Sequence, residues 1–274
     1  MAPRSCPGAR ATIDPAAPPA PEKSPTITRP VVFVHGVRTS SAIWSPQVAA
    51  IARRGHRSVA IDLPGHGARV RERFTAEAAS AAIDEAVDSC DVPPLLVGLS
   101  LGGYTSLAYA ARRESKLAGV VLAGCSTEIR GKPIGAYRRL AGHVTRTLHI
   151  GGEDWTVVTD MLTAIRGYSP LADLRGLGVP VWLVNGRRDP LRLDERRYLG
   201  ALPGTRLSVV PGAGHDVNSH QPIAFNRILL DALHELRLPA LHLPDLHLPE
   251  LHLPELHRPD LRDRLPQRHL PAVA

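Results

Sequence analysis

Six short runs of β-branched and other apolar residues, separated by stretches with helical patterns, constrain the fold of this chain more than any other feature. The runs lie at 31–34, 58–61, 95–97, 120–122, 181–184 and 207–210. Helical stretches are expected near residues 45–54, 75–89, 101–113, 191–200 and 219–236. Continuous apolar strands of this length are typical of parallel sheets that are covered on both faces. The alternation therefore predicts a doubly wound α/β sheet of about six strands.

Proline divides the chain into three parts. Residues 1–30 hold eight of the 26 prolines and show no periodic apolar face, so we expect a disordered arm. Residues 238–274 hold seven more, and a Leu-Pro-x-Leu-His unit repeats there at a spacing that no α-helix can accommodate. We expect an extended or polyproline-like tail, which is solvated or docks an unknown partner. The folded domain is predicted over residues 31–237.

The composition argues against several classes of protein. Three cysteines without metal-ligand spacing argue against a disulfide scaffold and a thiolate metal site. No apolar run reaches the about 18 residues of a membrane span. A secretory signal is not recognisable either, so we expect a cytoplasmic protein. The formal net charge of +7 comes from scattered arginines, with few aromatic residues between them, which argues against nucleic acid as a partner.

The strongest chemical signal is the sequence Gly98-Leu99-Ser100-Leu101-Gly102, which joins a predicted strand to a predicted helix. A serine hydroxyl is a poor nucleophile unless it is exposed and next to a base. A sharp strand–helix turn lifts Ser100 above the sheet edge, and the glycines on both sides prevent a clash in that turn. The helix dipole favours developing negative charge there. The pattern indicates a nucleophilic serine, and the alternative is an ordinary glycine-rich turn.

With these motifs the chain resembles the α/β-hydrolase family over roughly residues 30–236. The motifs follow the order of that family: His35-Gly36-Val37, then Asp62-Leu63-Pro64-Gly65-His66-Gly67, the serine turn, Gly186-Arg187-Arg188-Asp189, and Gly212-Ala213-Gly214-His215. The resemblance implies a mostly parallel sheet with helices on both faces and a small helical cap over residues 126–169. The short start before Val31 and the sequence Ser219-His220-Gln221-Pro222 more weakly resemble the branch of plant-type methylesterases and hydroxynitrile lyases.

The resemblance also implies roles for individual residues. His215 would accept the proton of Ser100, and Asp189 would orient the imidazole and stabilise its protonated form. The backbone amides of Val37 and Leu101 would form the oxyanion hole.

Other residues compete with these roles or support them. Asp194, inside the helix predicted at 191–200, and Asp216, directly after the histidine, are competing candidates for the acid. Asp189 has an alternative role as a helix N-cap. His35 is expected to support the oxyanion loop by hydrogen bonds.

Candidate substrate-binding residues come from the loop after the first strand and from the predicted cap. They are Trp44, Trp155 and Met161. Core packing is the alternative for each of these side chains, because a cap also has an apolar face to bury.

The predicted function is hydrolysis of a small carboxylic ester through an acyl-serine intermediate, without a metal or cofactor. A lactone or a thioester fits the same mechanism. A lyase on the same scaffold is a further alternative, for which Lys132 is the only lysine in the cap region. The remaining alternatives are a ligand receptor without turnover and a scaffold protein that acts through the repeat tail.

Overall fold

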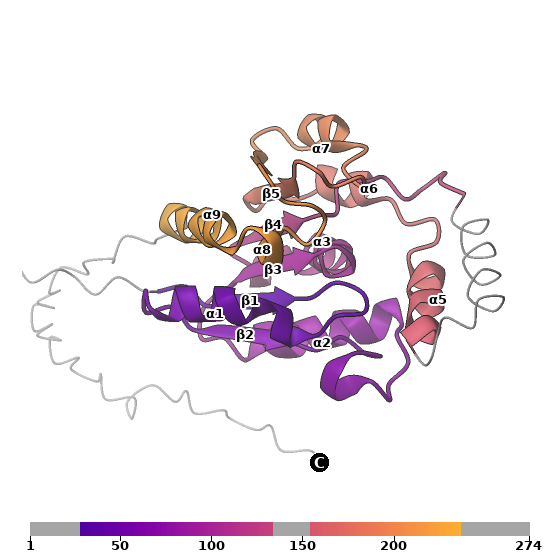
Figure 1. Ribbon diagram of the computed structural model, residues 1–274, viewed down its shortest axis with the longest axis horizontal. Helices are drawn as coiled ribbons and strands as arrows, with labels where there is room; N and C mark the ends of the chain where they lie inside the picture. Colours follow the sequence, from indigo (N-terminus) through magenta and orange to yellow (C-terminus); the bar gives the residue numbers. More distant parts are fainter. Residues whose placement is uncertain (1–27, 134–153, 237–274) are drawn as a thin grey trace, which may run out of the picture. The chain divides into compact units, whose positions relative to one another are not determined.

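A computed structural model describes residues 28–133 and 154–236 of the chain. A six-stranded sheet lies at the centre of this part, with all strands parallel and in the order β2-β1-β3-β4-β5-β6 (Figure 1). The strands are β1 (Val31–Val34), β2 (Ser58–Ile61), β3 (Leu95–Leu99), β4 (Gly119–Ala123), β5 (Val181–Gly186) and β6 (Arg206–Val210). The prediction of a parallel α/β sheet of six strands is confirmed.

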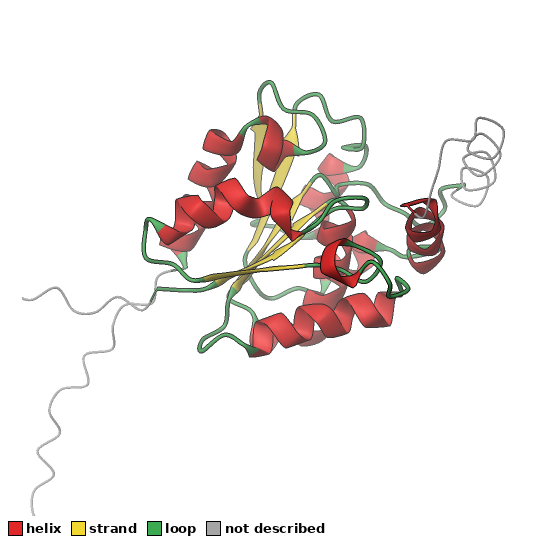
Figure 2. Cartoon of the chain, turned by 60° about the horizontal axis from the view of Figure 1, so that its bottom comes forward, coloured by secondary structure: helices red, strands yellow, loops and turns green. Residues whose placement is uncertain are grey.

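Helices cover both faces of the sheet (Figure 2). The first face carries α1 (Ser45–Ala52) and α9 (Pro222–Glu235), and the second carries α2 (Ala76–Asp88) and α3 (Leu101–Arg113). Shorter helices complete the described part: α5 (Asp154–Ala164), α6 (Pro170–Arg175), α7 (Glu195–Ala201) and α8 (Val217–His220). Single 3-10 turns lie at Ser41–Trp44, Gly67–Arg69 and Glu114–Lys116.

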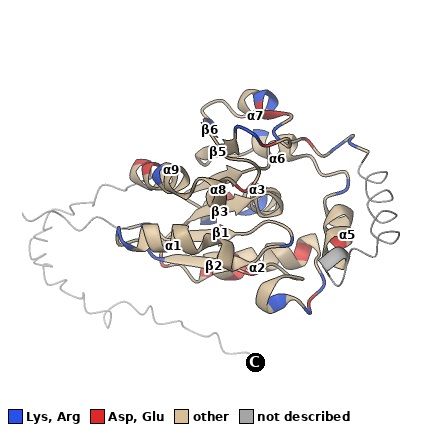
Figure 3. Cartoon of the chain, in the orientation of Figure 1, with Lys and Arg blue, Asp and Glu red and all other residues tan. Residues whose placement is uncertain are grey.

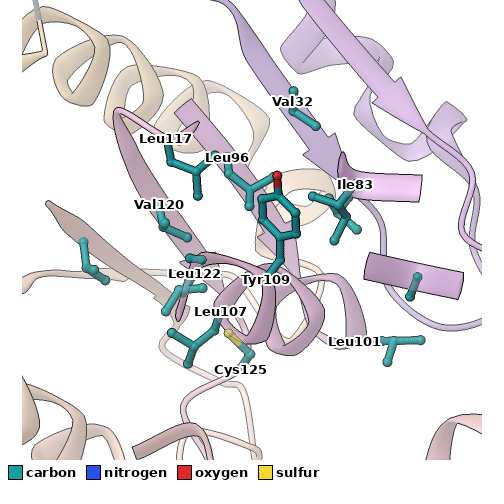
Figure 4. Packing of buried hydrophobic residues seen from close by; sticks show 14 of the residues in the cluster. Val32, Ile83, Leu96, Leu101, Leu107, Tyr109, Leu117, Val120, Leu122 and Cys125 are labelled. Atoms are coloured by element: carbon teal, nitrogen blue, oxygen red, sulfur yellow. The ribbon is translucent and has the colours of Figure 1, made fainter. Parts of the chain in front are cut away.

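Both faces of the sheet are apolar because side chains alternate along each strand. In β1, Val31 and Phe33 contribute to the core under α1 and α9, whereas Val32 and Val34 contribute to the core under α2 and α3. Figure 4 shows part of the second core, where strand side chains meet those of α3: Leu96, Val120, Leu122, Leu107 and Tyr109. Burial on two faces explains why the strand sequences are continuously apolar rather than alternating.

The strand order places two loops side by side at the carboxyl edge of the sheet. β1 lies between β2 and β3, so the loops after β1 and β3 leave neighbouring strands in opposite directions. Ligands of open α/β sheets bind at such a point. Ser100 directly follows β3, and Gly36 lies in the loop after β1.

Two predicted helices differ from the observed ones. The helix predicted at 191–200 starts too early, because Asp194 is the N-cap of α7. Its side chain accepts a hydrogen bond from the amide of Glu128, and the residues before Asp194 form a loop instead of a helix. The helix predicted at 219–236 is interrupted, because α8 ends before Pro222 begins α9.

Acidic and basic residues alternate along several elements, as the red and blue segments of α7 and α9 show in Figure 3. Three such pairs join Arg57 to Asp91, Arg192 to Glu195 and Arg206 to Glu235. Several of the scattered arginines are therefore paired with carboxylates.

The two ends of the described domain meet. Arg29 Nε donates a hydrogen bond to the carbonyl oxygen of Leu236 at 2.6 Å. The predicted tail (238–274), nearly all of the predicted arm (1–30) and the middle of the predicted cap (126–169) lie outside the described residues. Among the helices that are described, none is long and apolar enough to cross a membrane.

Candidate active site

Ser100 lies at a tight turn between β3 and α3. Its backbone has a φ of 54° and a ψ of −115°, a strained conformation for a residue other than glycine. The chain can make this turn only because its neighbours are small. A Cβ on Gly98 would lie 2.3 Å from the carbonyl oxygen of Gly102, and one on Gly102 would lie 2.2 Å from that of Val34. The structure thus agrees with the prediction that a side chain at either glycine would collide with neighbouring backbone.

Two loops bring a histidine and a carboxylate to Ser100. His215, in the loop after β6, places Nε2 at 2.8 Å from Ser100 Oγ. Asp189, in the loop after β5, places Oδ2 at 3.1 Å from His215 Nδ1. Because an ionised carboxylate only accepts hydrogen bonds, Nδ1 carries the imidazole proton and Nε2 accepts the hydroxyl of Ser100. Three residues from distant parts of the chain thus form one hydrogen-bonded row.

The pKa shifts within this row suit a base and its orienting acid. Burial opposes the ionisation of Asp189, but hydrogen bonds from His215 and from the amide of Leu191 outweigh it and hold the pKa of Asp189 below its ordinary value. The hydrogen bond to Asp189 raises the pKa of His215, and burial opposes this only in part. Asp189 is therefore ionised at neutral pH and stabilises a proton on His215.

The structure separates the three candidate acids. Asp189 is the one whose carboxylate forms a hydrogen bond with His215. The carboxylate of Asp194 instead accepts from the amide of Glu128, at 2.9 Å. Asp216 is the N-cap residue of α8, and its charge contributes to the raised pKa of His215. Asp189 is not the N-cap of α7, since Asp194 occupies that position.

The loop after β1 passes directly beside Ser100. A Cβ on Gly36 would lie 3.4 Å from Ser100 Cβ, and Val37 follows at this close approach. The amide of Leu101 belongs to the first turn of α3, where amides have no acceptor within the helix. The structure therefore brings both predicted segments next to the serine. Their role as an oxyanion hole stays a prediction.

Comparison with known sequences decides the family of this chain. Residues 31–228 match the sequence profile of the alpha/beta hydrolase family. The chain belongs to this family. The expected family and the expected class, a hydrolase acting on ester bonds, are thereby confirmed.

Several relatives illustrate this similarity. ABHD14B of Rattus norvegicus is 29% identical over 218 residues, which cover 75% of this chain and 83% of that protein. A pimeloyl-[acyl-carrier protein] methyl ester esterase of Neisseria meningitidis is 29% identical over 231 residues, covering 70% of this chain and 72% of the relative. The solved structure of NosK from Streptomyces actuosus matches with a TM-score of 0.64 at 24% identity, covering 77% of this chain and 99% of NosK. This last likeness concerns the fold.

His35 supports the loop beside Ser100 of this hydrolase. Its ring is fully buried, and burial lowers the pKa of His35 to about 4. Nε2 accepts a hydrogen bond from the amide of Leu63 at 3.0 Å, so Nδ1 carries the proton and donates to the carbonyl oxygen of Gly36 at 2.7 Å. A neutral imidazole thus ties the loop after β1 to the loop after β2.

The three residues predicted to bind substrate have different outcomes. Trp44 is fully buried and stacks on Phe33 with ring centroids 4.8 Å apart, while Phe225 lies 5.9 Å away. Its ring lies in the core between β1 and α9, which favours core packing for this residue over a place in the pocket wall. Met161 on α5 is half-buried against the core under α2 and α3. Trp155 belongs to α5, but its side chain lies outside the described part.

Three polar residues that sequence reasoning did not single out lie buried next to the site. Ser126, Thr127 and Glu128 follow β4 and are 0%, 8% and 5% exposed. The sequence signal for them is a polar run shortly after an apolar strand, at the edge of the sheet where the other motifs lie. Cys125 precedes them, and burial raises the pKa of its thiol far above the ordinary value, so it is not a reactive thiolate.

Proposed function

We propose that this hydrolase cleaves small carboxylic esters through an acyl-serine intermediate on Ser100. The observation that carries the proposal is the row in which His215 lies 2.8 Å from the serine hydroxyl and 3.1 Å from the carboxylate of Asp189. A serine becomes a good nucleophile when an oriented base lies within hydrogen-bonding distance. The strained turn at Ser100 adds support, because such strain is found where a side chain must be presented to a substrate.

Each group in the row has one task in this mechanism. His215 Nε2 accepts the hydroxyl proton while Ser100 Oγ bonds to the ester carbonyl carbon. The amides of Val37 and Leu101 stabilise the resulting oxyanion. The protonated His215 then donates its proton to the alcohol oxygen, the carbon–oxygen bond breaks, and the acyl group stays on Ser100. Water repeats the two steps and releases the acid.

The relatives support acyl transfer as the reaction class. The name of the Neisseria relative states a methyl ester as the bond that is cleaved. The name of ABHD14B gives protein-lysine deacylation as its proposed activity, which is the amide version of the same transfer. Lactones and thioesters remain alternatives for this chain, since the same row attacks any activated acyl carbon.

A lyase that depends on a lysine beside the site has less support. Lys132 Nζ lies 3.7 Å from the carboxylate of Asp194, and its side chain is 42% exposed. The ammonium group therefore faces a carboxylate outside the row of Ser100 and His215.

Chemical labelling of the serine tests the proposal. The native protein should hydrolyse p-nitrophenyl acetate and gain one fluorophosphonate adduct on Ser100, identified by mass spectrometry. Ser100→Ala should lose the adduct and at least about 10⁴-fold in kcat. Ser106→Ala is the matched control, because Ser106 is a buried serine of α3, the helix that follows Ser100, and its loss should leave both readings unchanged. Undiminished turnover in Ser100→Ala would contradict the acyl-serine mechanism.

A further inference from the structure

The loop that carries Asp189 is not fixed by apolar packing. Most residues from Arg187 to Leu193 are exposed, and the side chains with the largest apolar surface, Leu191 and Leu193, are 47% and 64% exposed. Asp189 itself is buried. Hydrophobic burial contributes little where apolar surface stays in water. Another interaction must therefore hold the carboxylate beside His215.

Hydrogen bonds with the residues after β4 hold the second half of this loop, from Leu191 to Asp194. The amide of Asp194 donates to the carbonyl oxygen of Ser126, and the amide of Glu128 donates to Asp194 Oδ2, each at 2.9 Å. The hydroxyl of Thr127 donates to the carbonyl oxygen of Leu191. We refer to these three hydrogen bonds as the polar clamp. It joins the residues after β4 to the loop after β5.

The polar clamp lies in the interior of the protein. Thr127 and Asp194 are 8% and 9% exposed. The carbonyl oxygen of Thr127 also accepts hydrogen bonds from the hydroxyls of Tyr104 and Tyr198, both at 3.2 Å, which fixes Thr127 from two helices. A buried hydrogen bond is costly to lose, because water cannot replace the missing partner.

Leu191 connects the polar clamp to the active site. Its carbonyl oxygen accepts the hydroxyl of Thr127, and its amide donates to Asp189 Oδ1 at 2.8 Å. The other carboxylate oxygen of Asp189 faces His215 Nδ1 at 3.1 Å. Hydrogen bonds therefore connect Thr127 to the imidazole through the backbone of a single residue, Leu191, and the carboxylate of Asp189. A displacement of Leu191 would turn the carboxylate away from His215.

Helix capping does not explain the side chain of Asp194. Asp194 is the N-cap residue of α7, yet its carboxylate makes no capping hydrogen bond to that helix. It accepts instead from the amide of Glu128 and from the guanidinium of Arg197, at 2.9 Å each. The carboxylate thus faces the loop after β4, which is where the polar clamp requires it.

We infer that Thr127 and Asp194 are positioning residues that hold the Asp189 loop, so that its carboxylate faces His215. Neither residue contacts the reacting atoms, so they act through Asp189. The inference rests on the proposed function for its catalytic meaning, but the arrangement itself can be measured without turnover. Thr127 also lies where the predicted cap begins, so the polar clamp would join the start of that cap to the loop that carries Asp189.

The hydroxyl of Thr127 offers the sharpest test. Thr127→Val keeps the shape of the side chain and removes the donor, whereas Thr127→Ser keeps the donor. We expect Thr127→Val to lower kcat for an acetate ester by about 10- to 100-fold, because small displacements of oriented groups cost this much. Thr127→Ser should stay close to the native protein. Equal losses in both variants, or no loss in Thr127→Val, would overturn the inference.

NMR titration of the His215 imidazole separates positioning from a general loss of stability. The hydrogen bond that His215 donates to Asp189 raises the pKa of His215, so loosening it should lower that pKa in Thr127→Val. The same downward shift should appear at the acidic limb of kcat/KM against pH. Thr127→Val with an unshifted imidazole would show that the residue does not position the acid.

Asp194→Asn supplies a second variant, with Asp84→Asn as its control. Asp84 forms hydrogen bonds with Lys116 at 2.8 Å and Tyr109 at 2.7 Å, outside the polar clamp. Asp194→Asn should lower the pKa of His215, as Thr127→Val does. Asp84→Asn should lower the melting temperature and leave the pKa of His215 as in the native protein. Equal His215 titrations in the two variants would count against the inference. If the native protein shows neither turnover nor serine labelling, the proposed function fails, and the titration still tests the positioning.

Discussion

Ser100 and Asp189 belong to one hydrogen-bonded row, but different forces hold them there. Around Ser100, backbone segments approach so closely that a Cβ at Gly98 or Gly102 would lie within 2.3 Å of a carbonyl oxygen. Around Asp189, the loop is exposed, and hydrogen bonds from Thr127 and to Asp194 hold it. Tight backbone packing fixes the position of Ser100, whereas hydrogen bonds fix the position of Asp189.

This difference has consequences for how each side responds to change. Close packing of backbone tolerates no added atom, but it does not depend on pH or charge. A hydrogen-bonded loop tolerates changes of shape and fails when a donor or a charge is removed. Substitutions on the two sides should therefore differ in what they damage, the fold or the turnover.

Asp189→Asn should have the largest effect on turnover. We expect kcat to fall by about 10⁴-fold, since the amide cannot stabilise a protonated imidazole or select its tautomer. The protein should stay folded, as measured by its melting temperature, because the volume and the acceptor for Leu191 are kept. Asp216→Asn is the control and should cost less than about threefold, because Asp216 acts on His215 through its charge alone. Similar losses in both variants would contradict the assignment of the acid.

Gly102→Ala should damage the fold rather than the chemistry. The added methyl would lie 2.2 Å from the carbonyl oxygen of Val34 and 2.5 Å from that of His35, so backbone must move. We expect unfolding free energy in urea to fall by about 4 kcal/mol or more. Gly200→Ala in α7 meets nothing within 4 Å and should stabilise by up to about 1 kcal/mol. If Gly102→Ala unfolds at the same urea concentration as the native protein, tight packing at Gly102 is not required for the turn at Ser100.

The pH dependence of stability should depend on His35, a buried titratable residue in the loop beside Ser100. Its pKa is about 4 in the folded chain against 6.5 in the unfolded chain. Between these values the unfolded state takes up a proton that the folded state does not, so stability falls as the pH drops through this window. The loss should reach about 3 kcal/mol.

Urea unfolding at pH 7.0 and pH 4.5, compared between variants, measures how much His35 contributes to this loss of stability. His35→Asn should reduce the loss of stability between the two pH values, because no imidazole remains at position 35 to titrate. His234→Asn, at an exposed position on α9, should leave the difference as it is in the native protein. If His35→Asn leaves the difference between the two pH values unchanged, other groups cause the pH dependence of stability.

Lys132→Ala should have the smallest effect. Its ammonium group lies 3.7 Å from Asp194 and is 42% exposed, so the pair should contribute less than about 1 kcal/mol. Turnover of acetate esters should change by less than about threefold, measured as kcat/KM. Complete loss of activity would contradict the ester hydrolase and favour a lysine-dependent lyase.

The serine side was readable from the sequence because its determinants are local. The apolar runs end where the strands end, and the glycines that the turn requires stand within two residues of Ser100. Parallel strands bring their carboxyl ends to one edge, so motifs after β1, β5 and β6 were expected to meet there. His215 and Asp189 do meet Ser100 in the predicted order.

The acid side was readable only in part because its determinants are distant in sequence. The start of α7 depends on a hydrogen bond between Asp194 and Glu128, which are 66 residues apart, and no local pattern announces it. Burial of Trp44 likewise depends on Phe225 in α9, which is 181 residues away along the chain. Propensity and periodicity describe neighbours along the chain, whereas these contacts arise from the tertiary fold.

The hydrogen bond between Arg29 and Leu236 has a use in protein engineering. Because these two residues lie at the two ends of the described domain, a short linker can join the ends and close the domain into a ring. New termini can then be opened at the exposed turn of Gly204, between α7 and β6, where nothing lies within 4 Å of an added Cβ. Such a circular permutant would separate Asp189 from His215 in chain order while it keeps every strand of the sheet.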